Sequence, residues 1–348
     1  MKQGWGRTLQ IAFTYMGAVI GAGFASGQEA IQFFLVFGYR GLWGIILATV
    51  LLAFFGALTL YLTRATGINN YRDFINIVLG KRVGKWTDLC LAVFLWIGLS
   101  IMLAGSGSVF AEHLAVSPYL GTTVTALMVA VVLLGGVNRV VWLNTALVPV
   151  LVGVTLMVSA TGLTCSGISA PLPEAVPPML LGKTWWIASV LYVSYNLAIG
   201  TVLLVSLGDK GTVAGGVLGG LGLGVVLMAM AIALALHYPA ASQYEVPMLY
   251  VAGVRYPGLR VAYALVLWFA MATTAVADGY GLASRLASRH LPYPAVVVMV
   301  IVSSLPLSRY GFARMVGSIY PLFGYIGMVI LAGLGFQAWQ RVWNKKAR

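Results

Sequence analysis

The chain has 348 residues, of which 60% are hydrophobic and only 8% are charged, against about 25% charged residues in ordinary soluble domains. So few charged side chains cannot cover the surface of a soluble fold of this length, which excludes an ordinary soluble enzyme and a disordered chain. The composition predicts an all-α polytopic membrane protein with one transmembrane domain over residues 1–348.

Ten apolar segments are candidates for membrane spans, since a spanning helix needs about 20 apolar residues. In chain order they are 8–37, 41–64, 84–114, 119–136, 140–161, 184–207, 211–237, 256–289, 292–307 and 311–341. The ninth is short because prolines bound it. The connections 161–183 and 238–255 are expected outside. We predict a surface helix over Asn69–Leu79 and a covering helix over Val246–Val254.

The net charge of +13 comes from basic residues beside the apolar segments. This pattern orients a membrane protein and does not indicate nucleic-acid binding. With the N-terminus inside, 15 of the 21 Lys and Arg residues fall on the inner side, so both termini are expected in the cytoplasm. Cys90 and Cys165 fall on opposite sides, and no disulfide is expected between them.

The ten predicted spans divide into five plus five, over about 8–161 and 184–341. A repeated unit with an odd number of spans inserts in the opposite orientation, which gives an inverted repeat. The first span of each half is interrupted, by Gly21-Ala22-Gly23 in one and by Ser194-Tyr195-Asn196 in the other. Paired broken helices point to the binding site of a secondary transporter.

The glycines of the first span offer backbone groups to a ligand if the helix breaks there. Carbonyl oxygens of the preceding half would bind a cation, and N–H groups of the following half would bind a carboxylate. The alternative is close helix packing, because Gly17 and Gly21 form a G-x-x-x-G face.

A face of the eighth span carries Ala270, Thr273, Thr274, Ala277 and Asp278 at helical spacing. Hydroxyl groups on a stripe of small residues suit a hard cation that needs oxygen ligands. The alternative is that the threonine hydroxyls donate to carbonyl groups of their own helix.

Glu29 and Asp278 are the acidic residues placed well inside predicted spans, where a carboxylate is a functional candidate. Asp278 is expected to attract Na⁺, carry a proton or close an inner gate. Glu29 is expected to act in coupling or gating, or alternatively to hydrogen-bond a neighbouring helix.

Further solute contacts are expected from Tyr195 and Asn196 in the sixth span and from Met102 and Ser106 in the third. Small-residue packing is the alternative for the third span. No His, Cys or Glu grouping has the spacing of a metal site, and no catalytic motif is present. We therefore expect no enzyme activity and no resident cofactor.

The stretch Ala12–Glu29 resembles the opening helix of the YkvI family of bacterial membrane proteins and the broken first helix of the amino acid–polyamine–organocation superfamily, which has the LeuT fold. The resemblance implies a bacterial inner-membrane protein. It also implies a Na⁺ site whose ligands are the carbonyls of Gly17, Ile20 and Ala270 and the hydroxyls of Thr273 and Thr274.

One departure from that superfamily limits the sodium sites. Symporters with a second sodium ion carry Asn after the Gly-x-Gly, and this chain has Phe24 there. We therefore expect one sodium ion, with Phe24 facing the solute.

The resulting expectation is a Na⁺-coupled symporter of a small amino acid-like, zwitterionic or amine solute. The solute's carboxylate would lie on the amides of Gly21, Ala22 and Gly23, and its ammonium group near Tyr195. Two alternatives stay open, which are proton coupling through Asp278 or Glu29 and a ligand receptor of the same fold that does not transport.

Overall fold

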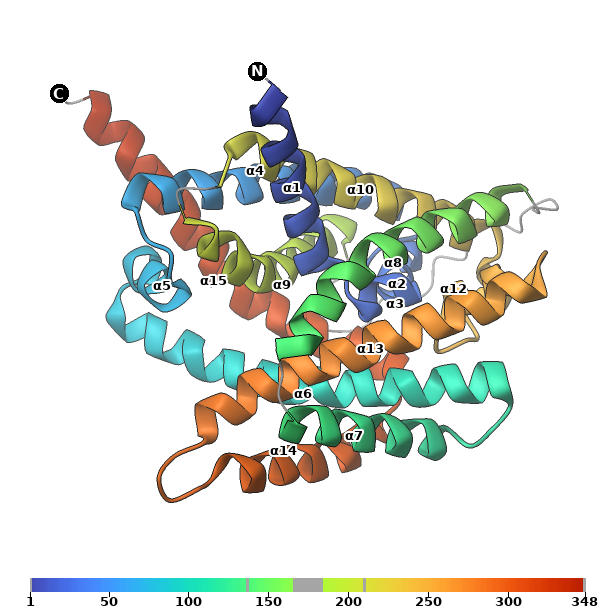
Figure 1. Ribbon diagram of the computed structural model, residues 1–348. Helices are drawn as coiled ribbons and strands as arrows, with labels where there is room; N and C mark the ends of the chain where they lie inside the picture. The colour runs from blue at the N-terminus through green and yellow to red at the C-terminus, as the bar shows by residue number, and fades with distance from the viewer. Residues whose placement is uncertain (1, 136–137, 165–183, 209–210, 347–348) are drawn as a thin grey trace.

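The computed structural model describes residues 2–135, 138–164, 184–208 and 211–346, and all regular secondary structure in these ranges is helical (Figure 1). Most of the predicted outer connection 161–183, with Cys165, lies outside the described residues. The all-helical prediction is therefore confirmed for the described part of the chain.

Eight described helices are long and apolar enough to span a membrane. They are α4 (Arg40–Thr66), α6 (Lys81–Leu114), α7 (Pro118–Gly135), α8 (Asn138–Thr164), α9 (Trp185–Ser206), α10 (Val213–Leu236), α13 (Pro257–Leu286) and α15 (Phe312–Lys346). The predicted ninth span is the shorter apolar helix α14 (Tyr293–Ser308). The chain is a multi-pass membrane protein, with exposed apolar side chains such as Phe54 and Val131 suited to lipid contact.

The predicted first span, 8–37, is broken, as its glycines suggest. It consists of α1 (Lys2–Val19), α2 (Ala22–Ser26), α3 (Gln28–Phe33) and the 3₁₀ turn η1 (Leu35–Phe37). Gly21 is extended between α1 and α2, and Gly27 separates α2 from α3 with φ of +85°. A left-handed φ favours glycine because it has no Cβ.

The predicted break in the sixth span is wrong. Helix α9 runs without interruption from Trp185 to Ser206. Its polar side chains bond within the helix, since the Ser194 hydroxyl donates to the Val190 carbonyl (2.6 Å) and the Asn196 amide to the Tyr192 carbonyl (3.0 Å). Gly200 stays helical, and a Cβ there would lie 3.3 Å from the Tyr15 ring, so packing explains it.

Three short helices lie between the long ones: α5 (Tyr71–Leu79), α11 (Tyr238–Ala241) and α12 (Pro247–Gly253). The helices expected over Asn69–Leu79 and Val246–Val254 are therefore present. Asn70 caps α5, because its side chain accepts a hydrogen bond of 2.8 Å from the Arg72 N–H.

Helix α10 packs closely on α4, and α13 packs closely on α6 and α8. Helix α1 contacts α10 and α9. A Cβ on Gly216 of α10 would lie 2.6 Å from the Ala57 backbone nitrogen, so the glycines of α10 bring the two backbones together. In Figure 1, α1 runs across the direction of α6, α10 and α13 instead of along it. Its broken end enters the middle of the bundle.

Candidate functional site

A cavity of about 570 Å³ lies at the break between α1 and α2. The wall combines the broken segment with α6, α8, α9, α13 and α15. It brings together most of the residues singled out from the sequence, namely Gly17, Ile20, Gly21, Ala22, Gly23, Phe24, Glu29, Met102, Tyr195, Asn196, Ala270, Thr274 and Asp278. Its size is that of a small-molecule site.

Two expected site residues lie behind the cavity wall. Ser106 is fully buried, and its hydroxyl donates to the Met102 carbonyl (2.9 Å), so the expected solute contact is not seen. Thr273 is 3% exposed, and its hydroxyl donates to the Ala270 carbonyl (3.1 Å). In this structure both hydroxyl groups therefore donate within their own helix.

The helix break releases backbone carbonyl groups into the cavity wall. The Gly21 N–H, which would reach the Gly17 carbonyl in a continuous helix, donates to the Val19 carbonyl instead (2.9 Å). Within the described ranges, no backbone N–H donates to the carbonyls of Gly17 or Ile20. Two of the expected cation ligands are thus available, whereas the Gly21 amide expected to bind a carboxylate is already used.

On α13, Ala270, Thr274 and Asp278 follow one another at helical spacing and all line the cavity. No described residue is hydrogen-bonded to the Thr274 hydroxyl. Carbonyl and hydroxyl oxygens therefore come from both α1 and α13 to one cavity, and such oxygens are the ligands of a hard cation. Among the described residues no three His, Cys, Asp or Glu side chains are grouped to hold a metal ion.

The Asp278 carboxylate has neither a hydrogen-bond donor nor a basic partner among the described residues. It lies against Gly98 of α6, where a Cβ would be 2.6 Å from Asp278 Oδ2. An uncompensated carboxylate within a membrane protein favours a bound cation or a proton. The sequence identified Asp278 as a candidate. Gly98 could not be identified, because a single glycine in an apolar span does not indicate which side chain lies against it.

Glu29 forms a polar contact with aromatic side chains at the other side of the cavity. The Tyr195 hydroxyl donates to Glu29 Oε2 over 2.6 Å, and Glu29 is 4% exposed. The Tyr195 and Tyr320 rings lie 4.9 Å apart between centroids. Tyr320 of α15 lines the cavity and was missed from the sequence, although it precedes Pro321 inside an apolar helix.

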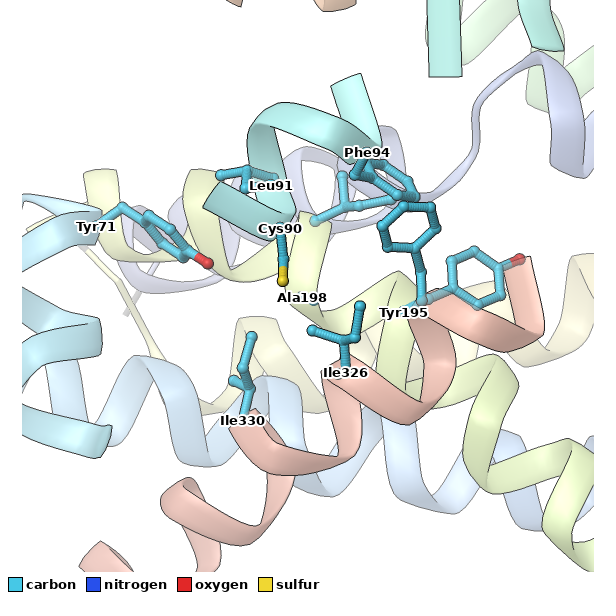
Figure 2. Close-up of a pocket in the computed structure, with 11 residues that line it drawn as sticks. Tyr71, Cys90, Leu91, Phe94, Tyr195, Ala198, Ile326 and Ile330 are labelled. Atoms are coloured by element: carbon cyan, nitrogen blue, oxygen red, sulfur yellow. The ribbon is translucent and has the colours of Figure 1, made fainter. Parts of the chain in front are cut away.

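A second cavity of about 40 Å³ adjoins the first between α6, α9 and α15 (Figure 2). Figure 2 shows the Cys90 sulfur and the side chains of Ile326 and Ile330 pointing into it. Leu91, Phe94, Tyr195 and Ile199 line both cavities, so these four side chains form the wall between them.

The main cavity extends to Ser206 and Arg285, at the carboxyl ends of α9 and α13. Near the opposite ends of the helices, the Glu112 carboxylate of α6 accepts hydrogen bonds from the backbone N–H groups of Glu245 (2.5 Å) and Val246 (3.2 Å). The Glu245 carboxylate accepts one from the Ala313 N–H at the start of α15 (2.6 Å). These contacts tie the segment before α12 to α6 and α15.

Comparison with known proteins supports a membrane protein of this architecture. No family model matches the chain. The uncharacterized membrane protein YkvI of Bacillus subtilis (strain 168) is 28% identical over 342 residues, which cover 96% of this chain and 97% of that protein. The uncharacterized protein YyaD of the same strain is 26% identical, with coverage of 95% and 96%.

Solved structures of membrane transporters share the fold. Mhp1, a nucleobase-cation-symport-1 family transporter, has a TM-score of 0.60 at 15% identity, with coverage of 91% of this chain and 74% of that chain. A Na⁺-coupled sialic acid symporter has a TM-score of 0.62 at 12% identity, with coverage of 94% and 78%. The manganese transporter of Eremococcus coleocola, as a mutant, has a TM-score of 0.57 at 15% identity, with coverage of 93% and 78%.

Proposed function

We propose that the chain is a secondary active transporter that couples entry of one Na⁺ to entry of a small organic solute by alternating access. The observation that carries the proposal is the cavity at the break of the first span, where released carbonyls of Gly17 and Ile20 share a wall with Ala270 and Thr274. Transporters of the same fold include a Na⁺-coupled symporter, which is consistent with this chemistry.

In this proposal Na⁺ is held by the carbonyls of Gly17, Ile20 and Ala270 and the hydroxyls of Thr273 and Thr274. The Thr273 hydroxyl donates its proton to the Ala270 carbonyl, and a hydroxyl oxygen that donates its proton can also act as an acceptor or ligand. Phe24 lines the cavity where a second sodium site would need an oxygen ligand. Asp278 lies one turn beyond Thr274 and attracts the cation without entering its ligand set.

The solute site in this proposal consists of Ala22, Gly23 and Phe24 with Met102, Tyr195 and Asn196, all of which line the cavity. We further propose ten spans in a five-plus-five inverted repeat of the LeuT type, with a break in the first span alone. The bacterial inner membrane, with both termini in the cytoplasm, is the proposed location.

The proposed transport cycle uses the two ends of the cavity in turn. In the structure the cavity reaches Ser206 and Arg285, on the side that the basic residues assign to the cytoplasm. At the other end, the bonds of Glu112 tie the segment before α12 to α6, and in this proposal they hold that end closed. Opening outward would break these bonds and move α1 back against α13, which would bring its carbonyls towards Thr274.

The test is uptake into proteoliposomes driven by an inward Na⁺ gradient, after a thermal-stability screen of the purified protein against solutes with and without Na⁺. A ligand that binds the native state raises its thermal stability by mass action. Uptake that follows the Na⁺ gradient supports the proposal. Uptake driven by a proton gradient alone would favour coupling through Asp278 or Glu29, and binding without uptake would favour a receptor.

A further inference from the structure

The solute cavity is acidic in its interior. Glu29 and Asp278 both line it, whereas Arg285, the basic residue among the described lining residues, is exposed at the end of α13. Two carboxylates without a basic partner are unfavourable in a membrane interior. If Na⁺ lies near Asp278, an ionised Glu29 has no counter-charge in the cavity, and a cationic ligand would supply one.

The Glu29 carboxylate has one oxygen available to a ligand. The Tyr195 hydroxyl donates to Oε2, and no described residue donates to Oε1. That second oxygen lies beside Gly23, where a Cβ would be 2.9 Å from it. The carboxylate is thus held by Tyr195 at the cavity wall with an unused acceptor.

Aromatic rings line the same cavity as this carboxylate. Phe24, Tyr195 and Tyr320 all contribute to the wall, and the Tyr320 hydroxyl lies 3.1 Å from a Cβ built on Gly23. The faces of aromatic rings attract organic cations within about 6 Å of the ring centre. A carboxylate beside aromatic rings is the chemistry that recognises an ammonium group.

The smaller cavity supplies an apolar compartment next to this group. Apart from the Tyr71 hydroxyl and the Cys90 thiol, the side chains around it are hydrocarbon or aromatic (Figure 2). Tyr195 lines both cavities, and its hydroxyl donates to Glu29. A ligand whose charge lies at Glu29 is therefore separated from the apolar compartment by the Tyr195 side chain.

From this arrangement we propose that the solute is an amphipathic organic cation, whose ammonium group pairs with Glu29 and whose apolar group packs on Leu91, Phe94 and Ile199, the wall that the main cavity shares with the small apolar compartment. The inference rests on the proposed transporter function and narrows its solute class. A carboxylate on the solute is not required, which agrees with the use of the Gly21 amide inside the chain.

The first experiment compares three probes of equal shape and different charge on the purified full-length protein in Na⁺. Benzylamine, benzyl alcohol and benzoate are titrated while the unfolding temperature is measured. We expect benzylamine to bind at least about tenfold more tightly than the other two, because only it pairs with Glu29. Equal or tighter binding of benzoate or benzyl alcohol would overturn the inference without the use of any variant.

A pair of variants then locates the charge contact. Glu29→Gln keeps the shape of the side chain and should weaken benzylamine binding about tenfold or more. Asp73→Asn removes an exposed carboxylate that lines neither cavity; it is the control and should leave benzylamine binding within about twofold. If the loss appears in Asp278→Asn instead, the cation is bound at Asp278 and the assignment to Glu29 is wrong.

The apolar compartment is tested through Cys90 in a Cys165→Ser background. Alkylation with N-ethylmaleimide should weaken binding of n-hexylamine at least about fivefold and leave n-propylamine nearly unchanged. A Cys90→Ala variant, treated identically, should show no difference. Equal loss for both amines would show that the apolar group lies elsewhere.

These binding tests use no ion gradient, so they separate the two proposals. Amine binding at Glu29 without Na⁺-driven uptake would refute the transport proposal and keep the ligand class. Na⁺-driven uptake of a solute with no cationic group would refute the ligand class and keep transport.

Discussion

The Asp278 carboxylate lies directly against the backbone of Gly98, where a Cβ would be only 2.6 Å from Oδ2. Helix α13 packs closely on α6, and Asp278 also lines the main cavity. The absence of a side chain at position 98 therefore lets a carboxylate lie at the cavity wall with no basic partner among the described residues. In the proposed mechanism this charge raises the local concentration of Na⁺ next to Thr274.

Gly98→Ala is expected to displace Asp278 and to weaken activation by Na⁺ about three- to tenfold, because the electrostatic attraction falls as the carboxylate moves. Asp278→Asn should have an effect of the same direction without abolishing sodium binding. The measurement is the Na⁺ concentration for half-maximal stabilisation against heat. Gly153→Ala is the control, since a Cβ there meets nothing within 4 Å. An unchanged Na⁺ dependence in Gly98→Ala would show that the Asp278 carboxylate does not attract the bound Na⁺.

Gly23→Ala and Gly21→Ala form a matched pair at the helix break. A Cβ at Gly23 would lie 2.9 Å from Glu29 Oε1 and 3.1 Å from the Tyr320 hydroxyl, whereas one at Gly21 meets nothing within 4 Å. Solute binding, measured by thermal stabilisation, should fall about tenfold or more for Gly23→Ala and change little for Gly21→Ala. The reverse order would show that the backbone conformation at Gly21, and not the space at Gly23, matters for the solute.

The sequence predicted the first helix break and wrongly predicted the second. In the first span, Gly21 and Gly23, two positions apart at mid-helix, weaken the helix, and the chain bends at Gly21. In α9 the polar residues Ser194 and Asn196 also indicated a helix break. Their side chains instead donate hydrogen bonds to carbonyl groups one turn back, and the helix stays intact. A polar group that can be satisfied inside its own helix does not require a break.

The sequence predicted those site residues whose residue type stands out from its neighbours in the chain. Glu29 and Asp278 stand out in an apolar chain because charge is rare there, and both line the cavity. Tyr320 and Gly98 could not be predicted, since their roles depend on which helices become neighbours in three dimensions. Ser106 shows the converse, because a hydroxyl on a small-residue stripe can bond to its own helix instead of a ligand.

Glu112→Gln should destabilise the closed outer end. The carboxylate accepts hydrogen bonds from two backbone N–H groups of the segment before α12. The Gln side chain keeps one acceptor oxygen and turns an NH₂ donor towards the second N–H, which should lower the free energy of unfolding by about 1–2 kcal/mol. Thermal unfolding measures the effect, with the exposed Asp73→Asn as the control. A loss no greater than that of Asp73→Asn would mean that these bonds do not hold the outer end closed.

The orientation is tested at Ser242, which is exposed in the segment between α11 and α12. A cysteine introduced at Ser242, with Cys90 and Cys165 replaced, should react in intact cells with a thiol reagent that does not cross membranes. The basis is the positive-inside distribution, with 15 of 21 Lys and Arg on the opposite side. Reaction that needs permeabilised cells would reverse the assignment of both termini.

The most direct test of sodium coupling is the Na⁺-dependent rise in unfolding temperature of the variant with Thr273→Val and Thr274→Val. Valine keeps the volume of threonine and removes two oxygen ligands, so the protein should still fold while its stabilisation by Na⁺ is lost. Thr59→Val is the matched control, because Thr59 is fully buried and its hydroxyl donates to its own helix at Phe55 (2.8 Å). Stabilisation of the double variant by Na⁺ equal to that of the wild type would contradict the account and place the cation elsewhere.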